Sequence, residues 1–136
     1  RDVDDYVRDL VGKLDARDEK TASIEALEKR AAKLVKTYLD HDVINNHHVP
    51  VTIKWVTNQK SRWGSCTPDD GKIRLSHRLR EMPAYVIECV LLHELIHLVV
   101  SDHSAKFYEF MNRYPHFEKA EAYLDGYAMA ERNNQI

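Results

Sequence analysis

Residues 90–107 read VLLHELIHLVVSDHSAKF and contain the pattern H-E-x-x-H, from His93 to His97. At about 100° per residue, His97 lies only about 40° round a helix from His93 and one turn along it, so both imidazoles face one side. Glu94 lies beside them, slightly rotated, and would reach a water on a metal ion rather than the ion itself. The flanking residues are apolar, and a core helix has no packing reason to bury such polar groups unpaired. The pattern therefore predicts a buried, metal-binding helix.

A third histidine, His103, follows His97 by six residues. On an uninterrupted helix His103 would lie about 240° away from His97, so the helix must end between them. Ser101 and Asp102 are suited to break the helix and to cap the next one. The turn would return His103 to the metal, giving three neutral nitrogen ligands and an open fourth position, as in catalytic zinc sites. We expect one Zn²⁺ ion per chain, although such a site would also accept other divalent ions.

A site of this kind predicts a hydrolase. Zinc lowers the pKa of its bound water from 15.7 toward about 7, and Glu94 would act as the general base that takes the proton and returns it to the leaving group. A further group must stabilise the oxyanion. Four residues are candidates, and the sequence does not choose among them: Arg62, His77, Tyr108 and Tyr114.

The rest of the chain predicts helices around a small sheet. Apolar spacing favours helices at about 6–14, 24–39, 83–100, 104–114 and 117–128. Alternation and turn residues favour strands at 51–56, 61–67 and 72–75. The order indicates an α+β fold in which a small antiparallel sheet packs on the histidine-bearing helix. We expect one domain over residues 1–136, with N-terminal helices in 1–42, the sheet in 51–76 and the remaining helices in 83–135.

The composition indicates a globular protein. Its 136 residues are 43% hydrophobic and 31% charged with a formal net charge of −2, which excludes a disulfide-dense mini-protein and a uniformly basic nucleic-acid binder. Two cysteines, Cys66 and Cys89, favour a reducing compartment, so we expect a cytoplasmic protein. The longest apolar run, residues 86–100, is too short to cross a bilayer and no signal peptide is visible, so no membrane association is expected.

Further signals accompany the histidines: Arg62-Trp63-Gly64-Ser65-Cys66, Ile73-x-Leu75, Pro83 and His103-Ser104-x-x-Phe107. In this combination the chain resembles the YgjP-like metallopeptidase domain, a group related to SprT-like and minigluzincin-type zinc proteins, over about residues 51–115. The resemblance implies a zincin-like core with His93, His97 and His103 as zinc ligands and Glu94 as the base. It also implies a peptide or protein substrate, which an edge strand would align through main-chain hydrogen bonds.

The chain departs from the family pattern in small ways. Ser76-His77 stands where an asparagine is common, and Phe107-Tyr108 stands where Phe-Trp is usual. These changes leave the metal site intact and affect the shape of the pocket. The metzincin proteases share the six-residue gap to the third histidine but need glycine where Val100 stands, and valine is poorly suited to a left-handed turn, so that kinship is disfavoured.

The segment Trp63-Gly64-Ser65-Cys66 has two interpretations. It is either a tight turn near the site, packed by Trp63, or a wall of the substrate cleft. Cys66 is also a candidate inhibitory or fourth metal ligand.

The uneven distribution of charge along the chain leaves other functions open. Residues 54–80 hold seven Lys or Arg against two Asp, whereas residues 81–136 hold four against nine acidic residues. A basic patch beside the metal would suit a nucleotide phosphohydrolase, or a DNA-associated SprT-like protease. The simpler explanation is that Lys and Arg protect the sheet from edge pairing, and no Gly-rich phosphate loop is present. A non-catalytic zinc protein is a third alternative, but a structural site would not need Glu94.

Overall fold

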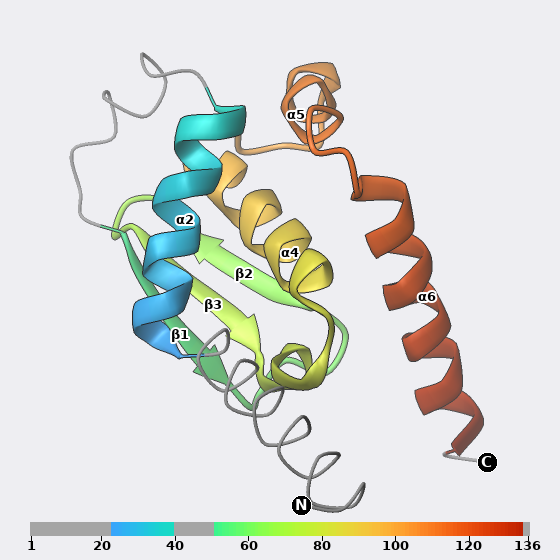
Figure 1. The fold of residues 1–136 in the computed structure, drawn as a ribbon. Coiled ribbons are helices and arrows are strands. Elements are labelled where there is room, and N and C mark those ends of the chain that lie inside the picture. Colours follow the sequence, from blue (N-terminus) through green and yellow to red (C-terminus); the bar gives the residue numbers. More distant parts are fainter. Residues whose placement is uncertain (1–22, 40–50, 135–136) are drawn as a thin grey trace, which may run out of the picture.

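The computed structural model describes residues 23–39 and 51–134, in which helices cover one face of a three-stranded sheet (Figure 1). The elements in chain order are α2 (Ile24–Tyr38), β1 (Thr52–Val56), β2 (Gly64–Thr67), β3 (Lys72–Ser76), the 3₁₀ helix η1 (His77–Glu81), α4 (Ala84–His97), α5 (Ala105–Met111) and α6 (Phe117–Asn134). The predicted α+β class is confirmed. The helix predicted at 6–14 lies outside the described residues.

The sheet has the order β1-β3-β2, and its two pairings differ in direction. β2 and β3 form an antiparallel hairpin through a turn in which Gly71 has a φ of 64°, a conformation that favours glycine. β1 pairs with β3 in parallel, with Val56 opposite Ser76. The predicted purely antiparallel sheet is therefore wrong for this pair. Residues 57–63 do not form a hairpin between β1 and β2, because they cross the end of β3 so that β2 can pair on its other side.

Along β1 and β3, side chains point alternately to the two sides of the sheet, which gives it an apolar face and a polar face. Ile53, Ile73 and Leu75 are buried against the helices, while Lys54 and Arg74, which are register partners, occupy the opposite face. α2 begins at Ser23, whose Oγ accepts a hydrogen bond from the Ala26 amide at 3.0 Å.

α4 is the central helix of the described structure and packs against α2, the sheet, α5 and α6. Because it has neighbours on nearly every side, it is apolar nearly all round, with Leu91, Leu92, Leu95 and Ile96 fully buried. Its last turn tightens as the amides of residues 98–100 bond to the carbonyls of Leu95 and Ile96. The helix therefore ends at His97, three residues before the predicted end.

α6 is attached more lightly, since only Ala120 and Leu124 of its residues are buried. It packs against α4 and lies at the right of the view in Figure 1. Among the described residues, no helix is both long enough and apolar enough to cross a membrane.

Candidate functional site

The three predicted histidines converge. His93 and His97 lie on α4, and His103 lies in the turn between α4 and α5. Their Nε2 atoms are separated by 3.1 Å (His93 to His97), 3.1 Å (His97 to His103) and 3.2 Å (His93 to His103). The predicted helix break is confirmed, although Ser104, rather than Ser101 or Asp102, stands at the N-cap of α5.

This donor set suits a divalent metal ion. Zinc with four ligands and Zn–N bonds of about 2.0–2.1 Å separates its nitrogens by roughly 3.3 Å, close to the distances found here. The Nδ1–H of His97 donates to the carbonyl of Val100 at 2.9 Å, which leaves its Nε2 with a free lone pair. Burial, reinforced by the two neighbouring imidazoles, lowers the pKa of His93 to about 4. Burial also lowers the pKa of His97. Neutral rings of this kind are what a metal requires.

The ring of Phe107 packs against all three imidazoles. Its ring centroid lies 4.8 Å from those of His93 and His97 and 5.0 Å from that of His103, and it stacks on His97. Phe107 is itself buried. Its packing therefore restricts the rotamers of the three histidines. The spacing of four residues from His103 was the available sequence signal for this contact.

Glu94 lies next to the histidines and is only 5% exposed. Burial raises the pKa of its carboxyl to about 7, although the positive charges of Arg62 and Arg74 act to lower it. Within residues 23–39 and 51–134, no hydrogen bond or ion pair engages this carboxylate. A buried, unpartnered carboxylate with a pKa near neutrality is typical of a general base.

Gly64 makes room for that carboxylate. A Cβ atom at this position would lie 3.2 Å from Glu94 Oε2 and 3.0 Å from the carbonyl oxygen of Arg74. Strand β2 therefore approaches α4 closely enough that a side chain here would press on the glutamate. The sequence places a glycine near the motif but does not reveal this contact.

The histidines and Glu94 open onto a cleft of about 830 Å³ between β2, α4 and α6. One wall contains Arg62, Trp63, Gly64 and Cys66, and the opposite wall contains Phe117, Glu121, Leu124 and Asp125. The interpretation of residues 63–66 as a tight turn is wrong, because residues 64–67 form a strand. The alternative, a wall of the cleft, agrees with the structure. The acidic residues of α6 in this cleft were not anticipated.

Of the remaining candidates, His77, Tyr108 and Tyr114 do not line the cleft, whereas Cys66 does. His77 is exposed on η1, and Tyr108 on α5 is 43% exposed, and neither lines the cleft. Tyr114 is buried with its hydroxyl 2.9 Å from the carbonyl oxygen of Tyr85 and 3.1 Å from Glu88 Oε2. Cys66 lines the cleft but is not among the atoms that gather with the histidines. Burial raises the pKa of its thiol to about 11.

Comparison with known proteins identifies relatives of this arrangement. The family model described as "YgjP-like, metallopeptidase domain" matches residues 3–127. No curated protein matches the sequence. Among solved structures, the metallopeptidase zymogen of Pyrococcus abyssi abylysin is similar with a TM-score of 0.59, at 18% identity over 76% of this chain and 93% of that chain. This likeness concerns the fold, which is zincin-like.

Proposed function

The chain belongs to the YgjP-like metallopeptidase domain family and is a metal-dependent hydrolase, and we propose that it cleaves peptide bonds with one Zn²⁺ ion held by His93, His97 and His103. The observation that carries this proposal is the meeting of three Nε2 atoms within 3.2 Å of one another, beside the buried and unpartnered carboxylate of Glu94. A structural metal site would have no use for such a carboxylate.

The metal ion, when bound, supplies a Lewis acid that polarises a carbonyl oxygen and lowers the pKa of water. The protein supplies the remaining chemistry. Glu94 accepts a proton from the attacking water and returns it to the leaving amine. Of the four candidates for oxyanion stabilisation, Arg62 is the one that lines the cleft, and we assign that role to its guanidinium.

The proposed substrate is an extended peptide. β2 is an edge strand in the described sheet and lines the cleft beside the histidines. Its free main-chain groups would pair with a peptide laid along the edge, which orients the scissile bond over the site.

The charges of the cleft favour a peptide over a nucleotide. Of the basic residues in 54–80, only Arg62 lines the cleft, whose lining also includes Glu121 and Asp125. Arg74 bonds instead to Ser65 and Thr67 of β2. A polyphosphate would be repelled by the acidic wall, and among the residues that the structure describes Arg62 is the only Lys or Arg that lines the cleft to hold it.

A parallel screen distinguishes the two substrates. The zinc-loaded protein is incubated with a library of quenched fluorescent peptides and with nucleoside triphosphates, with and without a chelator. We expect peptide cleavage that the chelator abolishes and that added zinc restores. Release of phosphate or pyrophosphate from nucleotides, without peptide cleavage, would overturn the proposal.

A further inference from the structure

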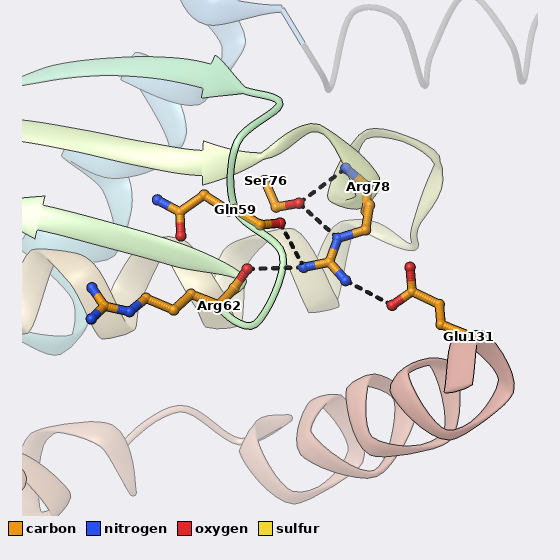
Figure 2. A network of polar contacts seen from close by, with 5 residues as sticks. All are labelled: Gln59, Arg62, Ser76, Arg78 and Glu131. Carbon is orange, nitrogen blue, oxygen red and sulfur yellow. Dashed lines mark hydrogen bonds and ion pairs between the residues drawn. The ribbon is translucent and has the colours of Figure 1, made fainter. Parts of the chain in front are cut away.

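Arg78 on η1 makes an unusually complete set of contacts for a residue that lies outside the cleft lining (Figure 2). Its Nε donates to Ser76 Oγ at 3.0 Å, and one terminal nitrogen donates to the carbonyl oxygens of Arg62 at 2.9 Å and Gln59 at 3.2 Å. The other terminal nitrogen pairs with Glu131 Oε1 at 2.7 Å. Four of the five guanidinium N–H donors are thus used, and the side chain is only 14% exposed.

The parallel pairing of β1 with β3 explains why a donor is needed there. Residues 57–63 must cross the end of β3 to place β2 on its far side. Within the crossing segment the Trp63 carbonyl accepts from the amide of Ser76 at 2.8 Å, whereas the carbonyls of Gln59 and Arg62 accept from no backbone amide among the described residues. The guanidinium of Arg78 donates to the carbonyls of Gln59 and Arg62. Ser76, at the end of β3, is fully buried and accepts from the same guanidinium.

The same side chain reaches both walls of the cleft. The guanidinium carbon of Arg78 lies 4.0 Å from the ring centroid of Trp63, which lines the wall formed by β2. Trp63 in turn packs edge-on against Tyr127 of α6, with ring centroids 5.6 Å apart. The ion pair between Arg78 and Glu131 is a second contact with α6. α6 supplies the opposite wall and buries only Ala120 and Leu124 of its own residues.

We propose that Arg78 is a positioning residue for substrate binding, acting through Trp63 and the backbone of residues 59–62 to set the separation of the two cleft walls. The inference rests on the proposed peptidase function. Arg78 has no contact with the three histidines, which are held by α4, its C-terminal turn and Phe107. Loss of Arg78 therefore loosens the cleft while leaving metal binding intact.

The kinetic test compares Arg78→Lys and Arg78→Gln with Arg80→Gln, a matched change of an exposed arginine on the same 3₁₀ helix. We expect KM for a cleaved peptide to rise by about tenfold in Arg78→Gln, with kcat changed by less than about threefold, because Arg78 bonds to the main-chain carbonyl of Arg62 and not to its guanidinium. Arg78→Lys keeps a charge for Glu131 but lacks the planar fork, so its KM should be intermediate. Zinc content should stay at one ion per chain in all three variants. A fall in kcat or zinc content at unchanged KM would overturn the inference, as would an equal effect in Arg80→Gln.

A second test does not depend on activity. In a Trp55→Phe background, Trp63 is the only tryptophan, and its quenching by acrylamide reports its exposure. We expect quenching to rise about twofold in Arg78→Gln and Glu131→Gln, but not in Arg80→Gln, at temperatures where circular dichroism shows each variant folded. Quenching that does not change in Arg78→Gln and Arg78→Lys would overturn the inference. Failure of the unaltered protein to cleave any peptide would instead overturn the proposed function, and the quenching result would still decide whether Arg78 holds this wall.

Discussion

At residue 64, the contact between β2 and α4 leaves no space for a side chain. A methyl group there would meet Glu94 Oε2 at 3.2 Å and the backbone of Arg74 at 3.0 Å. The carboxylate can rotate away, whereas the strand backbone cannot move without breaking its pairing with β3. An added side chain would therefore displace the glutamate, and it would also press on the Arg74 carbonyl and on Val90 Cγ1, which would lie 3.2 Å away.

Gly64→Ala is accordingly expected to lower kcat by about tenfold to a hundredfold while zinc content stays unchanged, because the displaced carboxylate no longer meets the proton it must accept. Steady-state kinetics and metal analysis check this. Gly126→Ala is the matched control, since an added Cβ there meets nothing within 4 Å. It should retain full activity and raise stability by about 0.5–1 kcal/mol, because alanine is favoured over glycine in a helix. Equal activity in both variants would show that Glu94 does not depend on this contact.

Glu94→Gln tests the proposed base directly. The amide has nearly the same shape but cannot accept a proton, so we expect kcat to fall by about 10²–10⁴-fold. Neither zinc content nor melting temperature should fall, because the amide occupies a buried position where the carboxylate had no partner. Activity that survives this substitution would mean that another group takes the proton.

The sequence was most informative about the metal site, because most of that site's geometry follows from the regular spacing of side chains on one helix. The convergence of His93, His97 and His103 follows from the angular spacing of a helix and the need for a break after it. The contacts of Gly64 and Arg78 could not be predicted in this way, because each joins segments that are distant in the chain. Which of the candidate residues face the cleft is likewise a property of tertiary packing.

At the scale of elements, the three strands were predictable but their order was not. Asn58, Gln59 and Lys60 look like a hairpin turn by composition, and such a turn would give antiparallel neighbours. The chain instead crosses the end of β3, where carbonyl acceptors meet a donor from η1. Backbone acceptors are present in every sequence, so no residue pattern marks this choice.

The attachment of α2 to α4 depends on a polar contact within an apolar interface. Arg30 of α2 forms an ion pair with Glu88 of α4, and Tyr114 places its hydroxyl against the same carboxylate. Glu88→Ala leaves both partners without this acceptor, and we expect the free energy of unfolding to fall by about 1–3 kcal/mol. Urea denaturation measures this loss. Zinc content and kcat should stay near their original values, because Glu88 does not line the cleft. A loss of zinc would show that the interface also controls the site.

At the scale of the whole molecule, the metal is expected to add stability to a fold that does not require it. α4 is held by buried side chains from α2, the sheet, α5 and α6, including Leu27, Leu75 and Phe107. The histidines, by contrast, meet at the rim of this core, and His103 is exposed. Removal of the ion should leave three imidazoles without a common partner but should not expose the core.

Chelation is therefore expected to lower the melting temperature without unfolding the protein. Zinc present at about 100 times its Kd stabilises the native state by about 2.7 kcal/mol, which corresponds to a shift of roughly 10 °C for a chain of this size. Calorimetry with and without chelator measures the shift, and circular dichroism should show the same helix content in both states. His103→Ala is the decisive variant: since His103 is exposed, its loss should leave the melting temperature of the metal-free protein unchanged while abolishing most of the zinc-dependent shift. A shift that persists in His103→Ala would mean that the ion binds elsewhere, and a loss of helix on chelation would mean that the core cannot form without it.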